Sequence, residues 1–464
     1  MAKDFTNDYT VGPITGPLVK FGIPLFLGNL LQIVYNMVDM IIVGNFCGQT
    51  GLSGVAVGGE ITEFFTVLIM GFSSAAQIIV AQLLGAGARD RIGRFIGTFA
   101  ITLGGAAVIN TTIALILRRH LLVWMNTPAE AFSEALGYSV VSMSSIVFVY
   151  GYNAVSAVMR GLGDSKRPFV FIATAAIVNL LLDLLFVAVF KMGAQGAALA
   201  TVMAQAISFI SALIYLGKNR QRLGFEMKKE DLRMDWSMFK TLVKLGIPMA
   251  LKSAAISLSK LFTNSFIHSY GLAVTTITAI GNKFNQIGNL VSNSLNTAGA
   301  SMIGQNIGAE KYNRVLKVML SVWIINVAIT AILAAVLMIF PEQVFGLFAS
   351  RDLMTVDPQI NKTLIAVGIE FVPMAVLGFF ASALRSGANS LVNGSGNASV
   401  NMAVALLDAF VLRIGLSLLF GLVFKMEYIG FWLGNYVSGF APFFIGIIFY
   451  MSGRWKTNKH VVKK

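Results

Sequence analysis

The sequence has little charge. Only 12% of its 464 residues are charged, whereas 56% are hydrophobic, and the mean hydropathy is +0.75. A soluble protein of this length needs far more charge to cover its surface. The chain is therefore predicted to be an integral membrane protein.

Residues suited to covalent, metal or nucleotide chemistry are also scarce. The single cysteine, Cys47, excludes an internal disulfide framework, and the histidines are too scattered to form a metal-binding motif. The sequence has no Gly-x-x-x-x-Gly-Lys-[Ser/Thr] motif, the usual phosphate-binding loop of an ATPase. No Ser/His or metal-binding constellation falls within the apolar segments. We therefore expect neither an enzyme nor a resident cofactor.

Twelve apolar segments are predicted to be membrane-spanning helices, which makes the chain an all-α membrane protein. They are expected near residues 18–43, 54–84, 92–117, 134–160, 168–190, 194–217, 241–268, 274–304, 315–340, 363–389, 400–424 and 428–451. Several exceed the roughly 20 residues that cross a bilayer, so tilted or bent helices are expected.

Basic residues lie mainly in alternate loops. The formal net charge is +14, but most of this charge falls between apolar segments, on the predicted side of the N-terminus. This is the positive-inside pattern of membrane proteins, so nucleic acid is not an expected partner. Both termini are predicted to be cytoplasmic, in a multi-pass protein of the plasma membrane.

The two halves of the sequence resemble one another. Three motifs recur in the same order: Lys20-Phe-Gly-Ile-Pro24 as Lys244-Leu-Gly-Ile-Pro248, Gln82-x-x-Gly85-Ala86 as Gln305-x-x-Gly308-Ala309, and Phe190-Lys-Met192 as Phe424-Lys-Met426. The charged segment that begins at Lys218 separates the halves. This predicts an N-lobe at 1–217, a cytoplasmic linker at 218–240, a C-lobe at 241–453 and a basic cytoplasmic tail at 454–464.

The repeat also predicts how the lobes are related. Six crossings return the chain to its starting side, so both halves have the same orientation in the membrane. Two six-helix lobes are then related by a pseudo-two-fold axis along the membrane normal, with a central cleft between them. This arrangement is suited to transport by alternating access of the two lobes.

The sequence resembles the multidrug and toxic compound extrusion (MATE) transporters over essentially its whole length. The resemblance is carried by five motifs: Asn36-Met-Val-Asp39-Met-Ile-Ile-Val-Gly44, Gln82-Leu-Leu-Gly85-Ala86-Gly87, Arg160-Gly-Leu-Gly163-Asp164-Ser-Lys-Arg-Pro168, Asn179-Leu-Leu-Leu-Asp183 and Gly196-Ala-Ala-Leu-Ala-Thr201. It implies a fold of two six-helix lobes and a secondary exporter of many amphipathic small molecules, driven by inward flow of Na+ or H+.

Two carboxylates lie deep in the predicted spans of the first half, Asp39 and Asp183. Burying a carboxylate there costs roughly 2.5–3.5 kcal/mol on insertion scales, so each is expected to have a role or a partner. Asn179 lies four residues before Asp183 and shares its helix face, and Thr201 on the next helix adds a hydroxyl. The resemblance implies that Asp39, Asn179, Asp183 and Thr201 form the coupling-cation site of the branch whose site is in the N-lobe.

Oxygen ligands of this kind suit Na+, whereas two carboxylates in a desolvated site also favour retention of a proton. The choice between Na+ and H+ therefore stays open. The alternative is that both acids are only polar contacts between helices. Gln32, Tyr35 and Asn36 lie on the helix face of Asp39 and are expected to touch substrate.

Pro24 removes a backbone donor from the first helix and permits a bend, so it is a candidate hinge. By resemblance, this bend would collapse the N-lobe cavity when Asp39 is protonated.

The second half lacks this site. At the spacing of the repeat, Asp39 corresponds to Thr263, Asn179 to Arg413, Asp183 to Ser417 and Thr201 to Asn435. The C-lobe spans carry cations instead, of which Lys252 and Arg385 are interpreted as snorkelling toward the cytoplasm. Lys260, Lys283 and Arg413 are deeper and are hypothesised to make the cleft wall electropositive. Alternatively, Arg413 forms a structural ion pair with Asp408.

Two functions follow from these features. The first is a Na+- or H+-coupled antiporter that exports amphipathic small molecules. A monomer is expected, because the cleft is complete within one chain. The second is a flippase for a lipid-linked or anionic amphiphile such as a cell-envelope precursor, held by the C-lobe cations. The absence of additional helices that would form a lipid groove favours the exporter.

Overall fold

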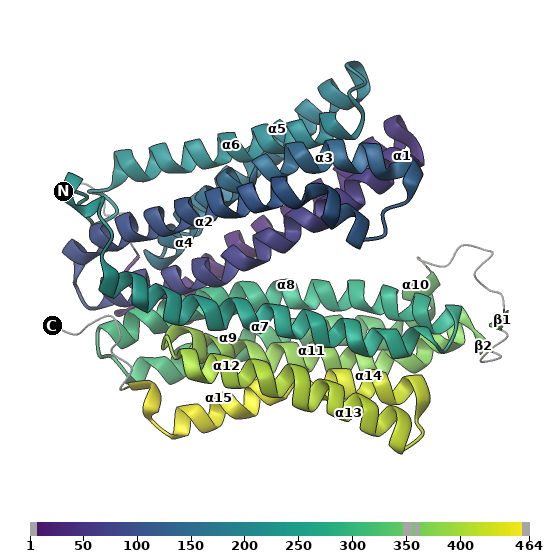
Figure 1. Cartoon of the computed structure of the whole chain (residues 1–464). Coiled ribbons are helices and arrows are strands. Elements are labelled where there is room, and N and C mark those ends of the chain that lie inside the picture. Colours follow the sequence, from purple (N-terminus) through teal and green to yellow (C-terminus); the bar gives the residue numbers. More distant parts are fainter. Residues whose placement is uncertain (1–6, 347–355, 358–361, 457–464) are drawn as a thin grey trace. The chain divides into compact units, whose positions relative to one another are not determined.

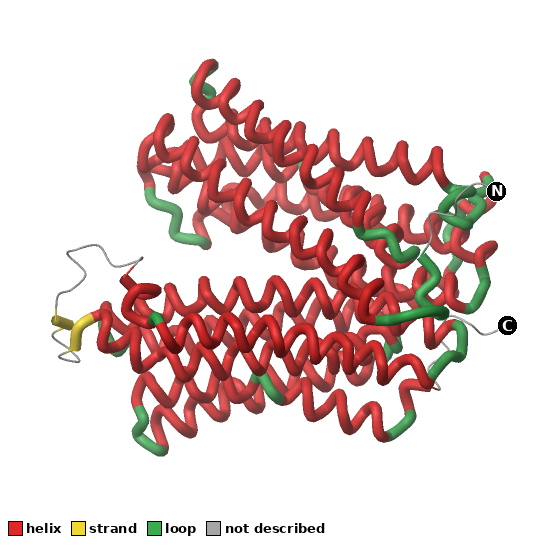
Figure 2. The backbone as a smooth tube through the Cα atoms, turned by 180° about the vertical axis from the view of Figure 1, so that it is seen from behind, coloured by secondary structure: helices red, strands yellow, loops and turns green. Residues whose placement is uncertain are grey.

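The structure is a computed structural model that describes residues 7–346, 356–357 and 362–456 (Figure 1). Helices account for most of it. The strands in the described residues are β1 (Val356–Asp357) and β2 (Lys362–Thr363), which pair antiparallel and are yellow in Figure 2.

The chain divides into two compact units. Of the described residues, the first contains 7–9 and Lys20–Ala250, and the second contains Thr10–Val19 and the described residues of 251–456. The division falls within a helix, α7. The predicted division into an N-lobe, linker, C-lobe and tail, at 1–217, 218–240, 241–453 and 454–464, therefore stays a prediction. Residues 457–464 of the predicted tail lie outside the described residues.

The first unit is built from long helices joined by short turns. Its elements are α1 (Thr15–Gly85), α2 (Arg89–Trp124), η1 (Ala129–Ala131), α3 (Phe132–Ser144), α4 (Ile146–Gly161), α5 (Lys166–Asp183), the π-helix η2 (Leu184–Val189), α6 (Gly193–Asn219), η3 (Lys229–Asp231) and the first part of α7 (Trp236–His268).

The second unit repeats this plan. Its elements are the rest of α7, α8 (Leu272–Gly308), α9 (Asn313–Ile339), α10 (Pro341–Gly346), β1, β2, α11 (Leu364–Gly394), α12 (Ala398–Leu406), the π-helix η5 (Leu407–Ile414), α13 (Gly415–Leu418), the π-helix η6 (Leu419–Val423), α14 (Glu427–Ser438), α15 (Ala441–Met451) and η7 (Arg454–Lys456).

All twelve predicted spans coincide with helices. In the described residues, nine helices are long and apolar enough to cross a membrane, or ten if α3 and α4 form one span bent by 42°. The numbers differ from twelve for two reasons. The helix α1 contains two predicted spans, and α8 has the length of a span but is rich in polar residues.

Gly48 separates the two spans within α1. Its backbone has φ 67° and ψ −165°, a conformation that is available to glycine but strongly disfavoured for residues with a Cβ. Pro24 also lies within α1, yet helical backbone continues through it. The break in α1 is therefore at Gly48, and the hinge role of Pro24 stays a prediction.

Apolar side chains cover the outside of many helices. Ile116, Ile324 and Ile332 expose 67%, 68% and 65% of their surface, on α2 and α9. In water such exposure would be costly, whereas lipid solvates it well. The exposed apolar surface therefore agrees with membrane-spanning helices.

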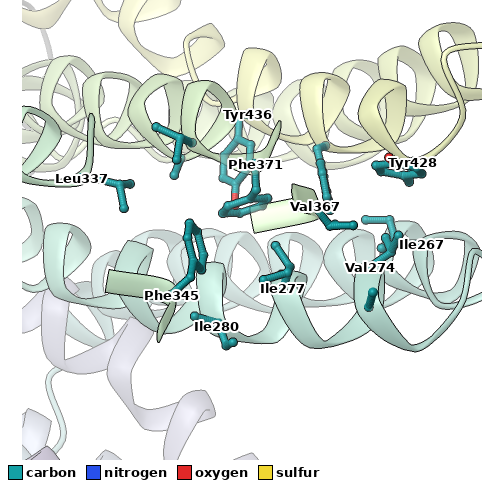
Figure 3. Packing of buried hydrophobic residues seen from close by; sticks show 14 of the residues in the cluster. Ile267, Val274, Ile277, Ile280, Leu337, Phe345, Val367, Phe371, Tyr428 and Tyr436 are labelled. Atoms are coloured by element: carbon teal, nitrogen blue, oxygen red, sulfur yellow. The ribbon is translucent and has the colours of Figure 1, made fainter. Parts of the chain in front are cut away.

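Aromatic packing forms the main core of the second unit. Phe371 of α11 packs edge-on against Trp432 of α14, with ring centroids 4.9 Å apart, and also contacts Tyr436. Figure 3 shows Phe371 and Tyr436 gathered with Ile277 of α8 between the helix ribbons. This core fixes α8, α11 and α14 against one another, and these helices carry much of the polar chemistry of the unit.

The repeat extends to backbone conformation. Lys191 and Lys425 both have φ 55°, a left-handed conformation, at equivalent turns after the π-helices η2 and η6. Gly163 and Gly396 are likewise left-handed, with φ 83° and 66°, just before α5 and α12. Motifs that recur in the sequence therefore fold into the same local structures in both units.

The charged linker packs against α2 in the first unit. A Cβ on Gly97 would lie 1.8 Å from the carbonyl oxygen of Asp231, and one on Gly93 would lie 2.1 Å from that of Glu226. The Thr98 hydroxyl accepts a hydrogen bond of 3.1 Å from the backbone N–H of Asp235. The linker therefore lies directly on a glycine face of α2.

Candidate cation and substrate sites

The structure brings together the four residues predicted to bind the coupling cation in the first unit. Asp39 lies on α1, Asn179 and Asp183 on α5, and Thr201 on α6. Asp183 is the last residue of α5, and the π-helix η2 begins directly after it. Such i→i+5 segments are frequent at functional sites because they interrupt the regular hydrogen bonding of a helix.

Asn179 and Thr201 join the fifth and sixth spans. The Asn179 amide donates from Nδ2 to the Thr201 hydroxyl at 3.4 Å, and Asn179 exposes only 4% of its surface. This contact turns the opposite side of the amide, which carries Oδ1, away from Thr201. The amide oxygen of Asn179 is therefore not used in this contact.

The carboxyl groups of Asp39 and Asp183 lie close enough to interact strongly with one another. Asp183 is 1% exposed, whereas Asp39 is half-buried. Two carboxylates at this separation cannot both be charged without strong repulsion, so a proton or a cation between them is favoured.

The two acids lie beside an apolar core. Tyr138 of α3 is near both carboxyl groups and belongs to a cluster with Val43, Val187 and Ala197. These neighbours exclude water, which strengthens each electrostatic interaction in the site. Tyr138 was not predicted as a site residue, because a tyrosine within an apolar span gives no signal in the sequence.

Each acid retains an oxygen with unused hydrogen-bonding capacity. Among the described residues, Oδ1 of Asp39 and Oδ1 of Asp183 are buried and have no hydrogen-bond partner. Buried polar atoms are normally satisfied, so an unmatched pair suggests a missing ligand. The donor set of carboxylate, amide and hydroxyl oxygens fits a hard cation such as Na+. In the described residues, no group of three or more His, Cys, Asp and Glu forms a transition-metal site.

The predicted substrate residues lie near these acids along α1. Tyr35 is half-buried and interacts with Gln32 and Asp39. Gln32 and Asn36 are exposed. Their placement on α1 leaves them accessible, and their contact with substrate stays a prediction.

Arg413 in the second unit is buried in an ion pair. Its Nη2 donates to Asp408 Oδ1 at 2.9 Å, and Nη1 donates to the backbone and side-chain oxygens of Asn435. Arg413 is 3% exposed and Asp408 is 1% exposed. Both lie in η5, where the five-residue spacing matches the i→i+5 period of a π-helix. These contacts favour the structural ion pair, and a cleft role for Arg413 stays a prediction.

The other cations of the second unit lie in different surroundings. Lys252 donates to Asn389 Oδ1 at 2.9 Å, and Arg385 donates to Asn289 Oδ1 at 2.9 Å. The sequence suggested snorkelling for these two side chains, but both are held by amides of neighbouring helices. Lys260 is exposed on α7 and interacts electrostatically with Arg385, and Lys283 is exposed on α8.

Two helical units of similar plan, each with buried polar side chains in its spans, define a membrane transporter built on an internal duplication. The MatE family model matches residues 24–185 and 248–419, one copy in each half. These segments include well over half of the chain. The chain therefore belongs to the MatE family of MATE transporters, and it is a multi-pass membrane transporter rather than an enzyme.

Named relatives span nearly the full length of the chain. A probable multidrug resistance protein of Bacillus subtilis (strain 168), YpnP, is 28% identical over 458 residues, which cover 98% of this chain and 99% of that protein. The probable multidrug resistance protein NorM of Thermotoga maritima is 23% identical over 98% of this chain and 96% of its own length.

Solved structures have the same fold. A structure described as MATE in the straight conformation matches with a TM-score of 0.86 at 20% identity, over 98% of this chain and 99% of that one. An outward-facing multidrug resistance MATE transporter of the MOP superfamily matches with a TM-score of 0.87 at 19% identity, over 99% and 100%. The predicted all-α fold of twelve spans is thereby confirmed.

Proposed function

We propose that the protein is a secondary active exporter that exchanges amphipathic small molecules for Na+ or H+. Its relatives include proteins named for multidrug resistance. The observation that carries the coupling proposal is the pair of close carboxyl groups, Asp39 and Asp183, each with a buried oxygen that lacks a partner among the described residues.

These side chains hold the driving ion. A proton shared by the two carboxyls relieves their repulsion, and a Na+ ion there is bound by the same oxygens with support from Asn179 and Thr201. The ion drives transport only if its affinity differs between the inward-facing and outward-facing states. Asp39 lies on α1 and Asp183 on α5, so any relative movement of these helices changes ion affinity.

Substrate binding is coupled to the ion through α1. Gln32, Tyr35 and Asn36 are on this helix within two turns of Asp39, and Pro24 lies about two turns before Gln32. Movement of α1 on ion binding would therefore alter the substrate contacts. The working form is a monomer in the plasma membrane with both termini in the cytoplasm, and it requires no cofactor.

Efflux from proteoliposomes tests this proposal. Purified wild type, Asp39→Asn and Asp183→Asn are compared for movement of a fluorescent lipophilic cation under an imposed Na+ gradient or an imposed pH gradient. One gradient should drive the wild type, and both variants should fall to the level of empty vesicles, because the shared carboxyl pair is lost. The effective gradient identifies the ion.

A matched control guards against a general defect in folding. Ser417→Ala changes the residue of the second unit that corresponds to Asp183, and it should retain gradient-driven transport. Monodisperse elution and an unaltered thermal midpoint establish that each variant is folded. Full transport by both acid variants would instead make Asp39 and Asp183 structural contacts between helices.

A further inference from the structure

The second unit contains an excess of positive charge within its spans. Lys252 and Lys260 of α7, Arg385 of α11 and Arg413 of η5 interact electrostatically with one another or with Asp408. Among the described residues, Asp408 is the carboxylate with which these cations interact. Four cations therefore surround one acid in a region where a charge is costly.

The Arg413–Asp408 ion pair does not neutralise the other three cations. Asp408 is in direct contact with Arg413, so that pair is close to neutral as a unit. The remaining ion pair described in the second unit joins Lys362 to Glu370 and does not include these residues. Lys252, Lys260 and Arg385, here named the α7–α11 cations, keep a combined excess of positive charge.

Neutral side chains orient two of these cations, Lys252 and Arg385, without cancelling their charge. Asn389 accepts from Lys252, while Asn289 accepts from Arg385 at 2.9 Å and from the Ser382 hydroxyl at 2.6 Å. Amide oxygens fix the direction of a cation but leave its net charge in place. The resulting group is pre-organised before any ligand arrives, which reduces the cost of binding.

The α7–α11 cations are also accessible. Lys260 is exposed, and Lys252 and Arg385 are only half-buried, in contrast to Arg413. Each retains donor N–H groups beyond the hydrogen bonds described above, since an ammonium has three and a guanidinium five. An anionic group that contacts them would gain charge-assisted hydrogen bonds and would relieve their mutual repulsion.

From this arrangement we infer that Lys252, Lys260 and Arg385 form a subsite for the anionic head of an amphipathic substrate. A carboxylate, sulfonate or phosphate supplies the chemistry that the group lacks. The inference rests on the proposed export function and extends it to anionic and zwitterionic substrates. Of the three cations hypothesised from the sequence, Lys260 belongs to this subsite, while Arg413 supports it from within the neutral pair.

Two matched probes test the subsite by binding. One is a dansyl amphiphile that ends in a sulfonate, and the other has the same body and ends in trimethylammonium. Dissociation constants are measured by dansyl fluorescence for full-length wild type, Lys252→Met/Lys260→Met and Arg385→Gln in phosphatidylcholine nanodiscs. Lys317→Met, which removes an exposed charge on α9 away from these side chains, is the control.

The sulfonate probe should lose about tenfold or more in affinity in the Lys252→Met/Lys260→Met variant, and less in Arg385→Gln. The trimethylammonium probe should bind equally well or more tightly, and Lys317→Met should resemble the wild type with both probes. Equal losses for the two probes, unchanged sulfonate affinity, or no sulfonate binding by the wild type would overturn the inference. Because removal of mutually repelling charges should not unfold the unit, thermal midpoints are expected to be maintained.

Two further arms separate the possible outcomes. The first arm adds phosphatidylglycerol to the nanodiscs. If a lipid headgroup is the natural occupant, this lipid weakens binding of the sulfonate probe to the wild type but not to the double variant. If the occupant is a free substrate, binding of the sulfonate probe is unchanged. Asp39→Asn should bind the sulfonate probe normally yet fail to transport either probe. Transport by Asp39→Asn would refute the proposed coupling site while leaving the anionic subsite intact.

Discussion

The two units place different charges on the same local framework. In the first, Asn179 contacts Thr201, and in the second, Arg413 contacts Asn435, at the positions that correspond in the repeat. Asp183 is matched by Ser417, whose hydroxyl donates to the carbonyl of Phe431 at 3.3 Å. The contact between the fifth and sixth spans of each half is thus retained although its chemistry has changed.

The duplicated helices and the charge within them are therefore separate features of the fold. The first unit keeps acids with unused oxygens, which suits a transient cation. The second holds a permanent guanidinium and balances it with Asp408. In the proposed transport cycle the first arrangement would change its charge, whereas the second would maintain it.

The largest expected effect comes from breaking the ion pair of the second unit. Asp408→Ala leaves the Arg413 guanidinium buried without its counter-charge, and should lower stability by roughly 3–5 kcal/mol. The double variant Asp408→Leu/Arg413→Met removes both charges and should recover most of this loss. Thermal unfolding in detergent, followed by intrinsic fluorescence, provides the measurement.

Asp39→Asn is the control for that result, because it removes an acid whose proposed role is in coupling. It should leave the thermal midpoint close to that of the wild type. Similar midpoints for Asp408→Ala and the double variant would show that the pair contributes little to folding.

A smaller effect is expected at Thr201 and Asn435, which occupy corresponding positions in the sixth and twelfth spans. Thr201→Ala removes a hydroxyl from the proposed cation site. If the Na+ gradient is the one that drives efflux, this variant should raise the half-maximal Na+ concentration about tenfold. Asn435→Ala, at the corresponding position, should leave this concentration unchanged. Initial efflux rates over a series of Na+ concentrations distinguish them, and equal shifts in both variants would contradict a cation site confined to the first unit.

The smallest expected effect concerns the turns that precede α5 and α12. Asp164 Oδ1 accepts from the N–H groups of Lys166 and Arg167, and Asn397 Oδ1 accepts from that of Val400. Burial raises the pKa of Asp164 above its usual value of 3.8, although Arg167 opposes the shift. Asn397 does not titrate, so the equivalent turn of the second unit lacks this pH dependence.

The sign of the effect follows from the raised pKa of Asp164 in the folded state. Its contribution is fully present below the pKa of the unfolded chain, near 4, and is lost as the pH rises through the higher pKa of the folded protein. As the pH rises across this interval, the thermal midpoint of the wild type should therefore fall relative to that of Asp164→Asn. Asn397→Asp should introduce a pH dependence that the wild-type turn lacks, and a flat difference for Asp164→Asn would contradict burial as the cause.

Much of the fold was predictable because the apolar segments and the repeated motifs are both long and regular. The closeness of Asn179, Asp183 and Thr201 followed from helical spacing and the order of the spans. The π-helix η5 did not follow, since no residue pattern marks it, and the ion pair between Asp408 and Arg413 therefore remained one of two alternatives. The contacts of Lys252 and Arg385 depend on how neighbouring helices are shifted along the membrane normal relative to one another. A single sequence does not specify this shift.

The packing of the linker on Gly93 and Gly97 has a practical consequence for imaging this transporter. A small membrane protein often needs a fused rigid domain before its particles can be aligned in electron cryomicroscopy, and a charged cytoplasmic loop is the usual insertion point. Here an insertion between Glu226 and Asp231 would force that loop away from α2 and disturb the helix. The exposed turn at Pro128, between α2 and η1, accepts an added domain without separating packed backbone.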